Sequence, residues 1–178
     1  MSDSPVVFSE LLAGNGKRIA RATLDVPATL NSLSLEMVDL LQPKIDEWAA
    51  DDSVAMVLID GAGEKAFCAG GDIQAMYHDM KANPGTAPGT ETFFTREYAL
   101  DYSLHVFPKP ILAWGHGIIM GGGMGISMGC SHRVVTEKAR IAMPEIGIGL
   151  FPDVGGSGFL NNMPGQAGRF LALTGASI

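Results

Sequence analysis

Hydrophobic and polar positions change their spacing twice within the first sixty residues. Between residues 18 and 26 small or apolar residues alternate with polar ones, which predicts a strand with one buried face. Ser34 is a suitable helix N-cap, and apolar residues then recur at helical spacing until about residue 51. The continuous apolar run at 54–59 predicts a strand buried on both faces. We therefore expect a βαβ-like unit at the start of an α/β fold.

The remaining pattern predicts more helices and strands. Residues 82–89 are rich in proline, glycine and small residues, which favours an exposed loop between two helical pieces. The elements expected after this loop are a helix over 93–106, a strand over 111–114, a strand-to-helix turn at 121–123, and short strands over 133–136 and 140–142. We detect no internal sequence repeat.

Composition narrows the class of protein. A chain of 178 residues that is 47% hydrophobic and 17% charged can bury one substantial core, so we expect a single domain over residues 1–178. The chain has 12 basic and 19 acidic residues, a net charge of -7. Nucleic-acid binding requires clustered Lys and Arg, and this balance argues against it. A small anionic ligand remains compatible, because local peptide amides can bind phosphate.

Cysteine content and the N-terminus suggest a compartment. Cys68 and Cys130 form neither a CxxC pair nor a paired framework, which favours a reducing environment. The first ten residues resemble neither a secretory signal nor an organelle presequence, so we expect a cytoplasmic protein. Residues 110–131 lack charged side chains but contain seven glycines and a histidine, so a buried strand and turn fit them better than a membrane span.

Two glycine-rich segments are candidates for binding an anionic oxygen. In KAFCAGGDI, two glycines precede a helix expected to begin at Asp72 or Ile73, and such a turn can expose peptide N–H groups. In MGGGMG, a helix that starts within the glycines would direct free amides at an anion. Ordinary loop punctuation and tight helix packing are the alternatives. Neither MGGGMG nor GIGLFP completes GxGxxG, so dinucleotide binding is disfavoured.

Several side chains are candidates for acid, base or nucleophile. Glu145 and Asp153 lie in the apolar segment MPEIGIGLFPDVGG, where desolvation favours the neutral acid and suits a group that exchanges protons near neutral pH. Capping of turns is the alternative. Cys68 as a thiol nucleophile is disfavoured because no pattern places a histidine beside it. By default Glu97 would be a solvated acid on a helix.

Taken in order, these segments resemble the crotonase superfamily, from about Val7 to the end of the chain. KAFCAGGDI is similar to its first oxyanion-hole segment, GHGIIMGGGMG to the second, AMPEIGIGLFPDVGG to its catalytic carboxylate segment, and ATLNSLSLEM to its early CoA-side loop. The resemblance implies an α/β fold built as a spiral of repeated ββα units. Family members continue beyond the end of this chain into further helices, so we expect an N-terminal fragment that is incomplete at its C-terminus.

The resemblance also implies roles for individual residues. Gly71 and Gly122 would donate the two N–H groups of the oxyanion hole, and Glu145 would be the catalytic carboxylate. Ordinary hydratases carry a second glutamate where this chain has Gly125. The sequence is closer to the 3-hydroxyisobutyryl-CoA hydrolases, which pair the PE glutamate with the aspartate of FPDVGG, matching Asp153. The remaining positions expected to contact substrate are Glu97, Ala66, Ala69, Gly70 and Asp72.

The expected activity is hydrolysis of a 3-hydroxyacyl-CoA thioester, with Glu145 either attacking the carbonyl or activating water. No metal or redox cofactor is implied, since CoA is part of the substrate. Acyl-CoA is the expected partner, no nucleic acid or membrane is expected, and a homo-oligomer remains open. Two alternatives stand beside this interpretation: an enoyl-CoA hydratase or isomerase, and a non-catalytic acyl-CoA-binding fragment.

Overall fold

The computed structural model describes residues 4–14 and 16–178 and places the strands in two sheets. The larger sheet has the order β1-β2-β3-β5-β7, with β1 antiparallel to β2 and the other neighbours parallel. The smaller sheet has the order β4-β6-β8 and is parallel. The strands are β1 (Val6–Leu12), β2 (Arg18–Leu24), β3 (Val54–Gly61), β4 (Ala66–Cys68), β5 (Ile111–Gly115), β6 (Ile118–Met120), β7 (His132–Val135) and β8 (Arg140–Ala142).

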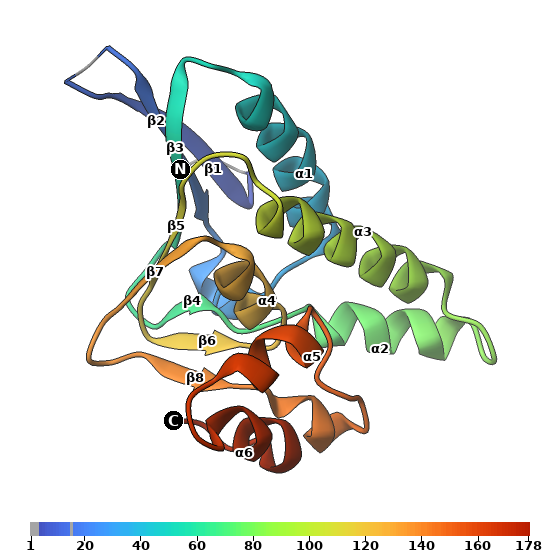
Figure 1. Ribbon diagram of the computed structural model, residues 1–178. Helices are drawn as coiled ribbons and strands as arrows, with labels where there is room; N and C mark the ends of the chain where they lie inside the picture. Colours follow the sequence, from blue (N-terminus) through green and yellow to red (C-terminus); the bar gives the residue numbers. More distant parts are fainter. Residues whose placement is uncertain (1–3, 15) are drawn as a thin grey trace.

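Helices pack around the two sheets (Figure 1). In Figure 1, α4 lies next to the small sheet, and α1 and α3 run together on one side. The α-helices are α1 (Leu35–Ala50), α2 (Ile73–Ala82), α3 (Pro88–His105), α4 (Gly122–Gly129), α5 (Gly156–Phe159) and α6 (Ala167–Thr174). Within residues 4–14 and 16–178, three 3-10 helices cover Pro27–Thr29, Pro144–Ile148 and Leu160–Asn162.

Successive strands alternate between the two sheets. β3, β5 and β7 join the large sheet, and each is followed by a short strand, β4, β6 or β8, that joins the small sheet. Each pass therefore adds one strand to each sheet before the chain returns, and after β4 and β6 it returns through helices. This is the spiral of ββα units that the resemblance implies.

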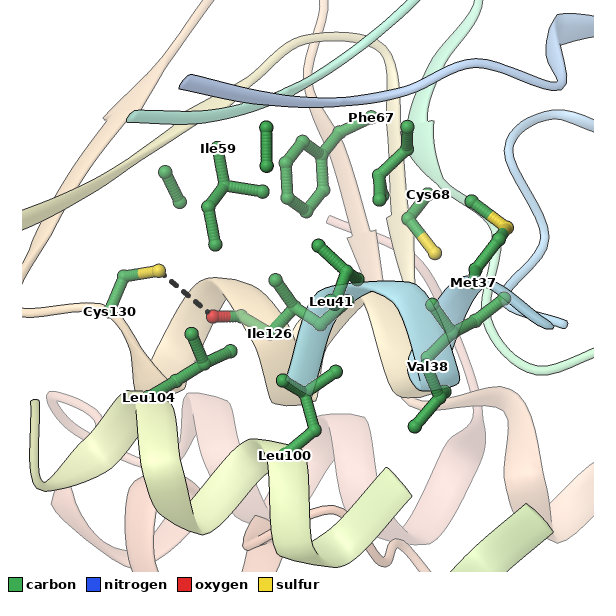
Figure 2. Close-up of a cluster of buried hydrophobic side chains, with 14 of the residues drawn as sticks. Met37, Val38, Leu41, Ile59, Phe67, Cys68, Leu100, Leu104, Ile126 and Cys130 are labelled. Carbon is green, nitrogen blue, oxygen red and sulfur yellow. Dashed lines mark hydrogen bonds between the residues drawn. The ribbon is translucent and has the colours of Figure 1, made fainter. Parts of the chain in front are cut away.

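The core lies between the large sheet and helices α1, α3 and α4. Helix α1 begins as expected, because Ser34 Oγ accepts a hydrogen bond from the N–H of Met37 at 3.2 Å. Pro43 lies within this helix, which continues past it to Ala50. Figure 2 shows side chains of all three helices meeting below the strands, among them Leu41, Leu100, Ile126 and others. This packing orients α3 and α4 toward each other, which matters for the site below.

Most expected elements are confirmed, with shifts at their ends. The loop predicted at 82–89 is shorter, because α3 already begins at Pro88. We did not predict β1, whose strand mostly faces solvent and so lacks a clear alternating pattern. The segment at 110–131 forms β5, β6 and α4, and no helix of the described residues is long and apolar enough to cross a membrane.

Candidate active site

Three parallel strands bring the candidate segments to one edge of the small sheet. β4 leads to Gly70 and Gly71, β6 leads to Gly121 and Gly122, and β8 leads to Glu145. Because neighbouring parallel strands end on the same side, the residues that follow them lie together although they are far apart in sequence. The small sheet thus assembles the three predicted segments (Figure 1).

The two predicted oxyanion-hole glycines are adjacent. A Cβ atom built on Gly122 would lie 3.4 Å from the peptide nitrogen of Gly71, and one built on Gly70 would lie 3.6 Å from the nitrogen of Gly122. Across residues 4–14 and 16–178, neither the Gly71 nor the Gly122 N–H donates to another protein atom. Gly122 is also the first residue of α4, so its amide lies at the positive end of the helix dipole.

Glycine is needed here for both conformation and space. Gly70 and Gly121 have φ values of +101° and +50°, a region that side-chain-bearing residues rarely adopt. A Cβ on Gly121 would also lie 2.9 Å from Glu145 Oε1. The carboxyl group of Glu145 therefore stands directly against the second glycine turn.

Glu145 lies in the first turn of the short helix Pro144–Ile148 and is buried. Its Oε2 atom has no hydrogen-bond partner among the described residues. Burial is the main cause that raises the pKa of Glu145 to about 7, and the negative charge of Asp153 adds to the effect. A carboxyl group with this pKa exchanges its proton near neutral pH, as general acid–base work requires.

Glu97 comes from α3 and reaches the same place. Its side chain is only 2% exposed, so the default expectation of a solvated helix acid is wrong. A Cβ on Gly122 would lie 2.3 Å from Glu97 Oε1, which places this carboxyl group beside the second amide. Burial, followed by the charges of Asp101, Asp153 and Glu145, raises the pKa of Glu97 to about 9. Glu97 is therefore neutral at pH 7 and can donate a hydrogen bond.

Asp153 is buried and receives a hydrogen bond from the hydroxyl group of Tyr98 at 2.6 Å. The next residue, Val154, has a left-handed backbone with φ +44°. The negative charge of Asp153 contributes to raising the pKa of Glu97 and of Glu145. Both carboxyl groups therefore lie close enough to Asp153 to interact with its charge. The hydrogen bond from Tyr98 holds the Asp153 carboxyl group in place.

The predicted substrate-contacting residues before α2 fall in two places. Ala66 lines a cavity of about 210 Å³ together with Asn31 and Lys65. Ala69 and Gly70 lead from there to the Gly71 amide. Asp72 has a structural role, because its side chain caps α2 by accepting a hydrogen bond from the N–H of Ala75. Its contact with substrate stays a prediction.

A larger cavity of about 1060 Å³ lies next to the glycine edge of α4. Its wall includes Asp153, Val154, Gly125 and Asp101, but not Gly71, Gly122 or Glu145. The cavity therefore does not contain the two amides or Glu145.

Three polar residues escaped the sequence interpretation. Asn31 is fully buried, and its amide donates to the carbonyl groups of Ala62 and Ala66 at 3.0 and 2.9 Å. Tyr98, which donates a hydrogen bond to Asp153, and Asp101 both lie in the helix expected over 93–106, and the helical pattern assigns neither of them to the site. The spacing of Glu97 and Asp101, four residues apart on a helix, could have placed both acids on one face.

Cys68 is fully buried, and burial raises the pKa of its thiol to about 12. A thiol with this pKa is not ionised at neutral pH. It packs as a small apolar residue.

The geometry can be compared with known proteins. The sequence model of the enoyl-CoA hydratase/isomerase family matches residues 19–178. The chain belongs to this family, which is the crotonase family. The carnitinyl-CoA dehydratase from Mycobacterium thermoresistibile, a solved structure, is 40% identical and superimposes with a TM-score of 0.90 over 98% of this chain and 49% of that one. The predicted crotonase-type fold is thereby confirmed.

The curated relatives include mitochondrial 3-hydroxyisobutyryl-CoA hydrolases. The protein of Danio rerio is 46% identical over 94% of this chain and 43% of its own length. The human protein is 48% identical over 86% of this chain and 39% of its own length. A third relative, 42% identical over 86% of this chain and 30% of its own, is the small ribosomal subunit protein mS47 of Neurospora crassa. The chain thus spans about two fifths or less of these relatives.

The names of the hydrolase relatives correct the expected cellular location of the protein. The hydrolase relatives from Danio rerio, human and Mus musculus are all named mitochondrial. The cytoplasmic location that we inferred from the first ten residues is therefore wrong. Composition at one end of the chain is a weak indicator of compartment, because targeting depends on a short segment that need not resemble the folded domain.

Proposed function

We propose that the full-length gene product hydrolyses the CoA thioester of a 3-hydroxy acid, such as 3-hydroxyisobutyryl-CoA. The observation that carries the proposal is the adjacency of two peptide N–H groups, at Gly71 and Gly122, that donate to no other described residue, with the buried Glu145 carboxyl group at the same sheet edge. The hydrolase names of relatives at 46–48% identity support it.

The two amides would bind the thioester oxygen as negative charge develops on it. Such a donor contributes about 3 to 4 kcal/mol to lowering the barrier. Glu145 then has two routes. Either its carboxylate attacks the carbonyl carbon, or it takes a proton from water so that hydroxide adds instead. In both routes the C–S bond breaks, the CoA sulfur gains a proton, and water supplies the second oxygen of the free acid. CoA is part of the substrate, and the proposal needs no separate cofactor.

Glu97 and Asp153 would flank the acyl group. Glu97 is neutral at pH 7 and lies against Gly122, so it can donate a hydrogen bond without adding negative charge near the oxyanion. Asp153 is held in place by Tyr98. The negative charge of Asp153 raises the pKa of both glutamates and so favours their protonated forms.

The packing around Gly125 argues against hydration by two glutamates. A Cβ at this position would lie 2.6 Å from Val154 Cβ and 3.0 Å from the Asp101 carboxyl oxygens. No side chain fits there without displacing a neighbouring element. Helix α4 therefore cannot supply a second glutamate at residue 125, and the additional acids of this site come from α3 and from the segment that contains Asp153.

Release of free thiol from 3-hydroxyisobutyryl-CoA tests the proposal. The wild-type protein and the variant Glu137→Gln, which removes an exposed acid outside the site, should both release CoA, whereas Glu145→Gln should not. Hydration of crotonyl-CoA without thiol release would favour a hydratase and refute the proposal. CoA binding without either reaction would favour the non-catalytic alternative. Turnover retained by Glu145→Gln would contradict the role of that residue.

A further inference from the structure

The first amide of the proposed oxyanion hole belongs to the peptide group that joins Gly70 to Gly71. This peptide group is trans, so its C=O and N–H bonds lie in one plane and point in opposite directions. The Gly70 carbonyl oxygen accepts a hydrogen bond from the N–H of Leu33 at 2.7 Å. The position of Leu33 therefore sets the direction in which the Gly71 N–H points.

The two amides of the proposed site are held in different ways. The Gly121 carbonyl oxygen, in the same peptide group as the Gly122 N–H, accepts hydrogen bonds from two N–H groups of α4. Helix α4 itself thus holds the second amide. Gly71 lies between β4 and α2 and is part of neither. Because glycine restricts the backbone least, the orientation of the first amide depends on contacts from another part of the chain.

Leu33 brackets Gly71 with two backbone hydrogen bonds. Its N–H donates to the carbonyl group before Gly71, and its own carbonyl oxygen accepts the N–H of the residue after Gly71 at 3.0 Å. The two residues form an isolated parallel bridge. A third hydrogen bond joins the same segments, since the carbonyl oxygen of Leu30 accepts the N–H of Ala69 at 3.1 Å. Residues 30–33 therefore hold the turn that presents the Gly71 amide.

The side chain of Asn31 holds this segment in turn. It is fully buried, and its Oδ1 atom accepts a hydrogen bond from the N–H of Val26 at 2.9 Å. Its amide nitrogen donates to the carbonyl groups of Ala62 and Ala66 at 3.0 and 2.9 Å. Both donor hydrogens and the acceptor oxygen are thereby used. Because Ala62 follows β3 and Ala66 begins β4, the side chain ties residues 30–33 to the two strands that precede Gly71.

Asparagine suits this position in conformation and in hydrogen bonding. The Asn31 backbone is left-handed, with φ +56°, a region that asparagine adopts more readily than most other residues. An aspartate of the same shape would keep the acceptor oxygens but lose both donors. The space is also limited, because a Cβ at Gly61 would lie 2.8 Å from Asn31 Nδ2.

We propose that Asn31 is a positioning residue that sets, through Leu33, the orientation of the Gly71 N–H toward the thioester oxygen. This inference rests on the proposed thioester hydrolysis and adds a residue that acts on the oxyanion without contacting it. Two explanations compete. Asn31 would only stabilise the fold, or it would only form a wall of the 210 Å³ cavity that it lines. The first predicts less folded protein and the second weaker CoA binding, and neither changes the polarisation of a bound thioester carbonyl.

The infrared band of the bound carbonyl group reports this polarisation. Full-length Glu145→Gln is loaded with 3-hydroxyisobutyryl-CoA labelled with carbon-13 at the thioester carbonyl, and the C=O stretch is compared with that of the free thioester in water. Hydrogen bonds from both amides should lower the frequency. Asn31→Gly in the same protein removes the side-chain amide but permits the left-handed backbone, and it should lose about half of this downshift because one of two donors is misplaced.

Ile45→Ala is the control for lost stability. It removes buried side-chain atoms of α1 outside the site and should keep the full downshift. Kinetics give a second measurement in full-length protein that retains Glu145. There Asn31→Gly should lower kcat by about 10- to 100-fold. The Kd of 3-hydroxyisobutyryl-CoA, measured on Glu145→Gln with and without Asn31→Gly, should differ by less than about threefold, because the interaction forms mainly in the transition state.

An unchanged downshift in Asn31→Gly would overturn the inference and leave the proposed hydrolysis standing. An equal loss of downshift in Ile45→Ala, or an effect confined to Kd, would overturn it as well. If Asn31→Gly does not fold, Asn31→Asp takes its place with the same expected results, and failure of both to fold would assign Asn31 a purely structural role. If Glu145→Gln itself shows no downshift, the two amides do not hold the thioester oxygen, which refutes the proposed oxyanion hole and this inference with it.

Discussion

Replacing Gly122 by alanine probes the close contact of α3 and α4 at the proposed oxyanion hole. The new methyl group would lie 2.3 Å from Glu97 Oε1 and 3.4 Å from the Gly71 nitrogen. Ordinary van der Waals contact begins near 3.4 Å, so Glu97 must move by about 1 Å, or α4 must shift. Overpacking of this kind costs about 1 to 3 kcal/mol of folding free energy.

We expect Gly122→Ala to lower kcat more strongly than it lowers the free energy of unfolding. The methyl group enters the space beside the two amides that would hold the thioester oxygen, and displacement of one such donor lowers kcat by about 100- to 1000-fold. Urea unfolding measures the first effect, and thiol release measures the second. Gly158→Ala is the matched control, because a Cβ there meets nothing within 4 Å and the backbone has no positive φ. We expect it to be fully active and slightly more stable, by about 0.4 to 1 kcal/mol.

A double variant separates the effect of the clash with Glu97 from the effect of filling the space beside the two amides. Glu97→Ala removes the atom with which the new methyl group collides, so combining it with Gly122→Ala should recover part of the lost stability. Activity should stay low, since the space beside the amides remains filled. If Gly122→Ala were as stable and as active as Gly158→Ala, the placement of Glu97 and both amides at one point would be refuted.

Three further predictions concern Glu145, the hydrogen bond between Tyr98 and Asp153, and Asp101. If Glu145 must be ionised to act, kcat/KM should rise with pH through about 7 and level off above it, and a flat profile from pH 5.5 to 8.5 would contradict this role. Tyr98→Phe removes the hydrogen bond to Asp153 and should lower kcat/KM by about tenfold, with little change in thermal stability because Tyr98 is exposed; unchanged kinetics would count against a role for the bond. The folded-state pKa of Asp101, about 8, exceeds its ordinary value of 3.8, so the unfolded chain releases this proton first and stability falls as pH rises from about 4 to 8. Urea unfolding should therefore show Asp101→Asn gaining stability over the wild type across that window, and a constant difference would contradict the raised pKa.

Local patterns in the sequence were sufficient for much of the fold. The cap at Ser34 and the apolar run at 54–59 each depend on nearest neighbours, and both elements form where expected. The short strand β4 has only three residues, too few for a period to be visible, and β1 is largely exposed. Such strands exist because a neighbouring strand pairs with them, which is information that lies elsewhere in the chain.

The site was predictable as segments but not as an arrangement of atoms. The glycines at 71 and 122 and the acid at 145 stand out as motifs, yet only the parallel pairing of β4, β6 and β8 places them at one edge. Burial of Glu97 depends on how α3 packs against the glycine face of α4, a long-range contact. For the same reason Asp101 passed as an ordinary helix residue.

A crystal structure of full-length Glu145→Gln with bound 3-hydroxyisobutyryl-CoA tests the central claim most directly. The account predicts the thioester oxygen about 2.7 to 3.1 Å from both the Gly71 and the Gly122 nitrogen, with residue 145 facing the carbonyl carbon. A thioester oxygen bound away from these two amides, or a carbonyl carbon out of reach of residue 145, would contradict it.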